Sequence, residues 1–199
     1  MLNLRNPHSG LTLSTKPQDR VFYLAGFLYL VLVYLLFFNR LDVKPLHNWD
    51  EAMFAVNVLE MQQQGAWLEG YFNGAPDLGN TKPVLPHSLQ RLSISVLGVN
   101  RLAFRLPSAL AALACSLLVG GLVWRWTRNR WMGLLAAAFL LSMRPFQHEH
   151  GARSGDMDAL LSLFMLVQVG AVVEVLRAEG PSWKWWIWAG VGVAGAVLT

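Results

Sequence analysis

The stretch Asn48-Trp49-Asp50-Glu51 begins a water-facing segment that runs to Leu85, between sequences too apolar to remain in water. If residues 50–64 form a helix, with about 100° of rotation per residue, their polar and apolar side chains fall on different faces. The polar arc contains Asp50, Asn57, Glu60 and Gln64, and the apolar stripe contains Phe54, Val58 and Met61. This pattern predicts an amphipathic helix lying along a membrane surface.

The composition is that of a membrane protein. The 199-residue chain is 54% hydrophobic and 14% charged, whereas an ordinary soluble domain is roughly 25% charged. Nine tryptophans, several beside apolar runs, fit the aromatic belts of membrane interfaces. The single cysteine, Cys115, excludes a disulfide framework and a cysteine-based metal site. The net charge of +4 is confined to loops, so it indicates membrane topology and no nucleic-acid partner.

Five apolar segments predict an all-α fold, a polytopic transmembrane helical bundle with interfacial helices in its first outward loop, residues 39–105. The segments cover residues 21–38, 106–124, 131–146, 157–175 and 183–199, and a span needs about 20 residues. No cleavage site follows the first segment, so we expect an anchor rather than a signal peptide. Because the last segment has no polar tail, we expect residues 1–199 to be the N-terminal part of one transmembrane domain whose C-terminal remainder is absent.

Charge in the short loops predicts the orientation. Short basic loops face the cytoplasm, and the turns at 125–130 and 177–184 and the N-terminus carry such charge. The loops at 39–105 and 148–156 then face outward, and nine of the twelve acidic residues lie in or beside them. We expect a multi-pass protein of the cell inner (plasma) membrane with a cytoplasmic N-terminus and a periplasmic site.

The first outward loop contains three candidate functional residues. Asp50 and Glu51 point about a quarter-turn apart, so they are expected to have different roles, and burial near a membrane raises a carboxyl pKa toward useful base strength. The alternative for Asp50 is an ordinary helix N-cap. Lys82, whose backbone the neighbouring prolines restrict, could meet a phosphate as a point charge. The alternative for Lys82 is snorkelling toward lipid headgroups.

The second outward loop ends in Arg153-Ser154-Gly155-Asp156-Met157-Asp158. We expect Arg153 and Asp158 to face a shared outer cavity, because ionisable groups at membrane depth are costly. The structural alternative makes Asp156 an N-cap with Asp158 in the first helical turn. The Asp-x-Asp pair could hold a divalent cation, but His148-Glu149-His150 lacks the His-Glu-x-x-His zinc spacing. No metal ligand is therefore assigned and the cofactor stays unknown.

Four motifs occur in order along the chain. They are Asp50-Glu51-Ala52-Met53-Phe54-Ala55, Thr81-Lys82-Pro83-Val84-Leu85-Pro86, Arg105-Leu106-Pro107-Ser108-Ala109 and Arg153-Ser154-Gly155-Asp156-Met157-Asp158-Ala159-Leu160-Leu161. Together they resemble the N-terminal part of the membrane glycosyltransferases related to protein O-mannosyltransferase and to the lipid A aminoarabinose transferase. The resemblance covers about residues 48–170 and implies a GT-C fold, of which this chain is roughly the first third, with a periplasmic or lumenal active site.

The resemblance also implies an activity, the transfer of a sugar from a polyprenyl-phosphate donor to an acceptor hydroxyl. The acceptor partner would be a glycolipid such as lipid A, another envelope glycan or a protein. Asp50 would act on the acceptor hydroxyl, which needs a base, and Lys82 would meet the charge of the leaving phosphate. The candidate site comprises the catalytic residues Asp50, Glu51 and Asp158 and the substrate-binding residues Lys82, Arg153 and Asp156.

The chain departs from the family pattern in two places. The family often reads Asp-Glu-x-Arg-Tyr and Glu-Lys-Pro-Pro-Leu, where this chain has Met53, Phe54, Thr81 and Val84. Loss of the arginine at Met53 removes a second phosphate-binding cation, and loss of the glutamate at Thr81 weakens any metal site there, so we expect a divergent donor or acceptor. The alternative functions are a transporter, which would carry charges or Gly and Pro breaks within its spans, and a non-catalytic membrane assembly subunit.

Overall fold

The computed structural model describes residues 17–80, 82–148 and 150–199. The regular secondary structure of this part of the chain is helical apart from one small antiparallel hairpin, β1 (Tyr71–Phe72) and β2 (Ala75–Pro76). The helices are α1 (Pro17–Val33), the π-helix η1 (Tyr34–Phe38), α2 (Asp50–Gln64), α3 (Leu85–Leu97), α4 (Arg101–Thr127), α5 (Arg130–Ser142), α6 (Arg144–Gln147), α7 (Asp158–Arg177) and α8 (Trp183–Val197). The predicted all-α class is confirmed.

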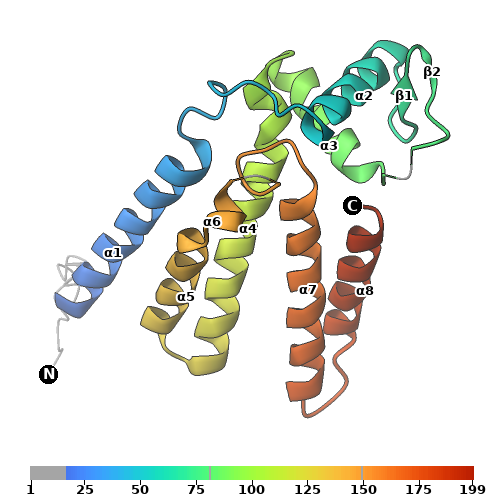
Figure 1. Cartoon of the computed structure of the whole chain (residues 1–199). Helices are drawn as coiled ribbons and strands as arrows, with labels where there is room; N and C mark the ends of the chain where they lie inside the picture. The colour runs from blue at the N-terminus through green and yellow to red at the C-terminus, as the bar shows by residue number, and fades with distance from the viewer. Residues whose placement is uncertain (1–16, 81, 149) are drawn as a thin grey trace, which may run out of the picture.

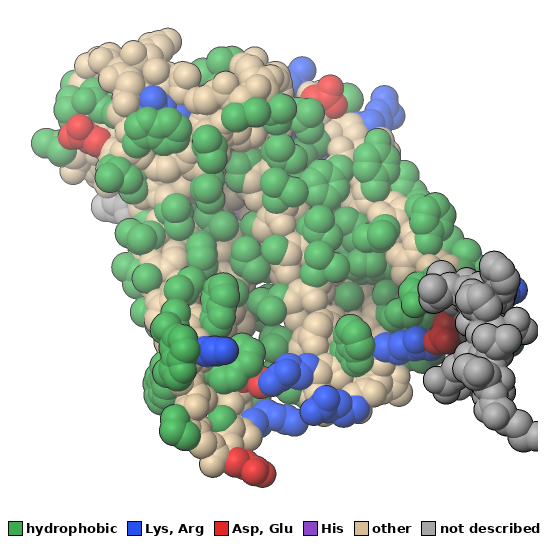
Figure 2. All heavy atoms as spheres, turned by 180° about the vertical axis from the view of Figure 1, so that it is seen from behind, with side chains coloured by type: hydrophobic (Ala, Val, Ile, Leu, Met, Phe, Trp, Pro, Cys, Tyr) green, Lys and Arg blue, Asp and Glu red, His purple; other side chains and the backbone are tan. Residues whose placement is uncertain are grey.

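The molecule has a helical bundle and a head at one end of it (Figure 1). Helices α1, α4, α5, α7 and α8 form the bundle, and α2, α3 and the hairpin form the head. The turns that join α4 to α5 and α7 to α8 lie at the opposite end. Figure 2 shows a broad band of hydrophobic side chains between charged side chains at both ends. The protein is therefore a multi-pass membrane protein with its head on one side of the membrane.

Three helical segments are long and apolar enough to cross a membrane, namely Pro17–Phe38, Arg101–Thr127 and Asp158–Arg177. The fourth, α5, has 13 residues and the fifth, α8, has 15. At 1.5 Å per residue, α5 reaches only about 20 Å, against a hydrocarbon core of about 30 Å. The expected span at 131–146 is divided because Pro145 sits in the first turn of α6, where a missing backbone N–H is tolerated. The five-span topology stays a prediction.

Glycines allow the bundle helices to approach closely. A Cβ added to Gly133 of α5 would lie 2.6 Å from the carbonyl oxygen of Gly120 in α4. A Cβ added to Gly192 of α8 would lie 2.6 Å from the backbone nitrogen of Gln168 in α7. Small residues support helix association in membranes because they let backbones touch. These two contacts fix α5 on α4 and α8 on α7.

The head packs on the N-terminal end of α4. Side chains of α2, α3 and α4 share one buried apolar cluster, which contains Phe54, Ala55, Val58, Ile94, Ala103 and Phe104. The bounds predicted for the amphipathic helix, 50–64, are those of α2, and its apolar stripe is buried. Asn57, on the predicted polar arc, is nevertheless buried, with its side chain 0% exposed. The hairpin and the residues after it fold back over α2, and Tyr71 and Asp77 in this segment accept hydrogen bonds from Asn57.

Candidate active site

Glu51 is the centre of a buried ion pair on the bundle side of α2. Its side chain is 1% exposed and accepts two hydrogen bonds from Arg105, from Nε to Oε1 (2.6 Å) and from Nη2 to Oε2 (2.9 Å). The backbone N–H groups of His47 (2.7 Å) and Gly155 (2.8 Å) complete the shell. Burial raises the pKa of Glu51, but the hydrogen bonds from these donors outweigh it and leave the pKa lowered. Glu51 therefore holds four chain segments together as a carboxylate.

Two arginines hold the backbone that leads from the first span to α2. Arg153 donates to the carbonyl oxygens of Leu36 (2.9 Å) and Asn39 (2.8 Å), at the end of η1. Such helix-end carbonyls have no partner within the helix. Arg105 donates to three further carbonyl oxygens, those of Leu41, Lys44 and Pro45. The route of residues 39–49 is thus set by guanidinium groups on α4 and on the loop before α7.

Asp50 differs sharply from its neighbour. It is the first residue of α2 and half-buried, and its carboxylate has no hydrogen-bond or ion-pair partner among the described residues. The N-cap is Trp49, so the alternative in which Asp50 caps the helix is wrong. Trp49 has φ of 126°, a strained conformation for a bulky residue of the kind that clusters at functional sites. The carboxylate of Glu51 is thus held by four hydrogen bonds, whereas the carboxylate of Asp50 has no partner among the described residues.

A basic cavity of about 690 Å³ opens beside Glu51. Its walls are formed by α4, α6, the loop before α7, and Lys44, Pro45, His47 and Glu51. Its ionisable lining comprises Lys44, His47, Glu51, Arg105, Arg144, His148, His150 and Arg153. Four lysine or arginine side chains face one carboxylate, so the cavity carries positive charge and suits an anionic group.

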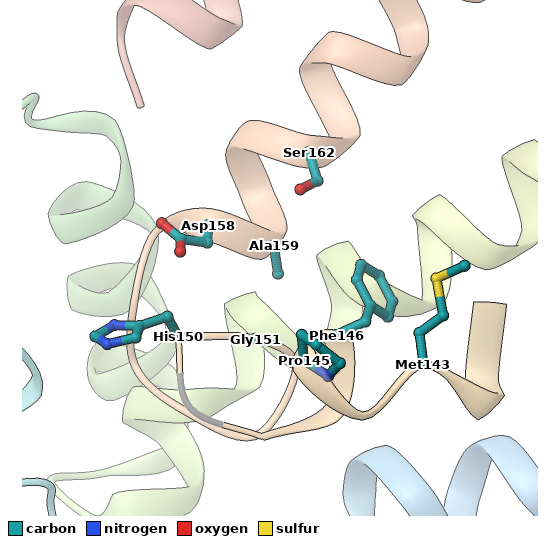
Figure 3. A pocket seen from close by; sticks show the side chains of 8 residues that line it. All are labelled: Met143, Pro145, Phe146, His150, Gly151, Asp158, Ala159 and Ser162. Carbon is teal, nitrogen blue, oxygen red and sulfur yellow. The ribbon is translucent and has the colours of Figure 1, made fainter.

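Asp158 lies in an adjoining cavity of about 610 Å³, which shares Pro145 and His150 with the basic cavity. Figure 3 shows Asp158 and His150 at one end of this space, with Phe146 and Met143 toward the other. The structure therefore places Arg153 and Asp158 in two neighbouring cavities that meet at His150. A single cavity shared by Asp50 and Asp158 stays a prediction.

Asp156 lies beneath these cavities. Its side chain is 6% exposed, its Oδ2 lies 3.2 Å from His150 Nδ1, and its Oδ1 has no partner in the part of the chain that the structure describes. Burial raises the pKa of Asp156, and the nearby charges of Glu51 and Asp158 raise it further, against the lowering effects of Ser154 and His150. The N-cap of α7 is Met157, so the capping alternative for Asp156 is wrong. Asp156 instead lies close enough to both Glu51 and Asp158 for their charges to raise its pKa.

Lys82 lies in a different place, on the head. It is exposed, and its backbone N–H donates to Asn80 Oδ1 (2.9 Å). It lines a cavity of about 280 Å³ together with Asn57 and His87. Asn57 is seven residues beyond Asp50 on α2, an axial rise of about 10 Å. Asp50 thus begins the helix that connects the basic cavity to the Lys82 cavity.

Sequence reasoning missed three residues of this arrangement. Arg105 was quoted only as part of a motif, although an arginine in an apolar helix calls for a partner. Asn57 and His87 gave no signal, because their burial depends on the hairpin and on α3. The described residues contain no group of three or more His, Cys, Asp or Glu side chains that could hold a metal ion. Two earlier expectations, the Thr81 departure and the His148-Glu149-His150 motif, involve residues 81 and 149, which lie outside the described residues.

The fold and the site define a class of protein, a helical multi-pass membrane protein with carboxylates, guanidinium groups and a lysine gathered beside cavities at one end. Residues 81–199 match the family model described as dolichyl-phosphate-mannose-protein mannosyltransferase, and the chain belongs to that family. A comparison with curated proteins gives no match.

Solved structures show the same fold. The chain is similar to crystal structures of ArnT from Cupriavidus metallidurans, in the apo state (TM-score 0.72) and bound to undecaprenyl phosphate (TM-score 0.69). Each comparison has 20% sequence identity and covers 92% of this chain and 33% of the ArnT chain. The chain thus spans about a third of the length of the proteins whose fold it shares.

Proposed function

We propose that this chain is part of an integral membrane glycosyltransferase that moves a sugar from a polyprenyl-phosphate carrier to an acceptor hydroxyl. The observation that carries the proposal is the carboxylate of Asp50 at the start of α2, which has no partner among the described residues and lies beside the ion pair of Glu51 and Arg105. Membership of the mannosyltransferase family supports the reaction class. The ArnT crystal structure with undecaprenyl phosphate bound supports the type of carrier.

In the proposed reaction Asp50 accepts the proton of the acceptor hydroxyl. The hydroxyl oxygen then forms a bond to the anomeric carbon, the bond from that carbon to the carrier phosphate breaks, and the phosphate leaves with the electron pair. A positioned carboxylate contributes about 10²–10⁴-fold as a general base. The ammonium of Lys82 meets the charge that develops on the phosphate. Glu51, whose lone pairs are occupied by four donors, serves as a positioning residue rather than as the base.

We assign the acceptor to the side of the basic cavity. Arg153 lines its wall, Asp156 contacts His150 of the lining, and Asp158 lines the adjoining cavity. Positive charge there favours an acceptor with an anionic group, whether a glycolipid or a protein. The head would face the periplasm and the short basic turns the cytoplasm, in line with the charge rule for short loops.

Replacement of Lys82 by Met is expected to weaken binding of polyprenyl phosphate at least tenfold, because a hydrogen bond to a charged group contributes about 1.5–3 kcal/mol. The measurement is a titration of polyprenyl phosphate into the chain in lipid nanodiscs. Lys184→Met, an exposed lysine at the start of α8 on the opposite end, is the matched control and should leave the affinity unchanged. Equal affinity of Lys82→Met and the unaltered chain would refute the phosphate role of Lys82.

A further inference from the structure

Two residues that line the small cavity beside Lys82 each have a buried polar atom without a partner among the described residues. These atoms are Oδ1 of Asn57, whose side chain is 0% exposed, and Nε2 of His87, which is 3% exposed. Both residues line the same cavity of about 280 Å³. A buried polar atom without a hydrogen bond costs about 1–3 kcal/mol, and nearly all such atoms are paired in folded proteins. Two such atoms on residues that line one cavity indicate a binding site for a ligand with hydrogen-bond donors.

The hydrogen bonds of Asn57 fix which of its atoms remains free. Its Nδ2 donates to the carbonyl oxygen of Tyr71 (3.0 Å) and to Oδ2 of Asp77 (3.2 Å). Both partners are acceptors, so the amide cannot be turned around. The unpartnered atom is therefore the carbonyl oxygen, an acceptor.

The same reasoning applies to His87. Its Nδ1 lies 3.2 Å from the carbonyl oxygen of Pro83, which can only accept, so Nδ1 carries the proton. Burial lowers the pKa of His87, which keeps the ring neutral. Its edge-on contact with Phe54 fixes the ring orientation. Nε2 therefore offers a lone pair, a second acceptor.

We propose that this cavity binds the sugar ring of the carrier-linked donor, with sugar hydroxyls donating to Asn57 Oδ1 and His87 Nε2. The proposal rests on the proposed function and adds to it the residues that recognise the sugar. Asp77 and Asn80 add further acceptor oxygens to the lining, and Lys82 in the same wall would hold the phosphate attached to the ring. At roughly 30 Å³ per water, the volume equals about nine waters, which suits one monosaccharide and not a lipid chain.

The lining favours a neutral ring with many hydroxyls over a metal ion. Two carboxylates, Glu69 and Asp77, and the ammonium of Lys82 line the cavity, and both unpartnered acceptors are uncharged. The described residues form no group of three or more His, Cys, Asp or Glu side chains that could hold a metal ion. A site that hydrogen-bonds a hydroxyl through buried groups discriminates strongly against a ligand that lacks it. The cavity should therefore bind a sugar-bearing carrier more tightly than the bare carrier phosphate.

The test compares two kinds of probe on the chain in nanodiscs. One is bare polyprenyl phosphate, and the other is a panel of polyprenyl phosphates that carry mannose, glucose, galactose or arabinose. We expect at least one sugar to bind tighter than the bare phosphate. His87→Asn should reduce that advantage at least fivefold while the bare phosphate binds as before. The asparagine amide can replace Nδ1 as donor to Pro83 and removes only Nε2.

A second variant fills the cavity without deleting a hydrogen bond. A Cβ at Gly70 would lie 4.0 Å from Asn57 Nδ2 and from Asp77 Cβ, in ordinary contact, so Gly70→Val extends into the space. It should also abolish the sugar advantage. Ser95→Ala, on the exposed face of α3, is the matched control and should change neither affinity.

The outcomes separate the two proposals. If bare polyprenyl phosphate binds through Lys82 but no sugar improves binding, or if His87→Asn and Gly70→Val retain the full sugar advantage, the sugar site is refuted and the proposed function stands. If the variants weaken the bare and sugar-bearing carriers equally, the cavity is only structural and the sugar site is again refuted. If neither kind of probe binds the unaltered chain, the proposed function fails and the sugar site with it.

Discussion

Asp50→Asn is expected to lower the rate of sugar transfer by about 10²–10⁴-fold, the contribution of a positioned general base. The asparagine has nearly the same shape but cannot accept the hydroxyl proton. Because Asp50 has no partner among the described residues, the substitution breaks no ion pair or hydrogen bond there and should leave the fold intact. The measurement is transfer of radiolabelled sugar from a polyprenyl-phosphate donor by membranes that contain the protein.

The matched control for this prediction is Asp42→Asn. Asp42 is an exposed acid in the segment that precedes α2 and should tolerate the change, with activity within twofold of the unaltered protein. Retention of most activity by Asp50→Asn, at equal protein levels in the membrane, would show that Asp50 is not the base.

Removal of one partner of the Glu51 and Arg105 pair is expected to have the largest effect on stability. Arg105→Met leaves a carboxylate that is 1% exposed without its countercharge, and such losses cost about 3–5 kcal/mol. Thermal unfolding in detergent measures the change. Arg130→Met, which removes the partly exposed pair with Asp19, should cost only about 0–1 kcal/mol. A similar, small loss for both variants would contradict the central role of the Glu51 network.

The same pair predicts a pH dependence. The pKa of Glu51 is lower in the folded protein than its ordinary value of 4.5. The unfolded chain therefore takes up a proton first as the pH falls, and the stabilisation from Glu51 is full above pH 4.5 and is lost below it as the pH approaches the folded pKa. Glu51→Gln should lack this component, so the stability difference between the two proteins should shrink below pH 4.5.

The sequence predicts the helices well because their signals are local. The start of α2 at Asp50, its end at Gln64 and the apolar spans all follow from side-chain periodicity and from runs of apolar residues. The break in the third span also has a local signal, Arg144-Pro145, because proline interrupts a helix. Local signals of this kind define elements and their approximate ends.

The site was only partly predictable because its contacts are remote in sequence. Arg105 lies 54 residues from Glu51, and no spacing rule joins them. Asn57 falls on the polar arc of α2 by angle, and only the return of the hairpin buries it. The sequence predicts that Asp50 and Glu51 have different roles. Only the position of α4, which carries Arg105, shows that Glu51 is the one held in an ion pair.

The most direct test of the account is the side of the membrane on which the head lies. Cys115 is buried, so single cysteines can be introduced and labelled in an otherwise unreactive chain. Leu78→Cys, at a residue 88% exposed on the head, should react with a membrane-impermeant maleimide added to the periplasmic side. Glu179→Cys, in the turn between α7 and α8, should react only after the membrane is opened. Labelling of Leu78→Cys from the cytoplasmic side alone would contradict an outward-facing active site.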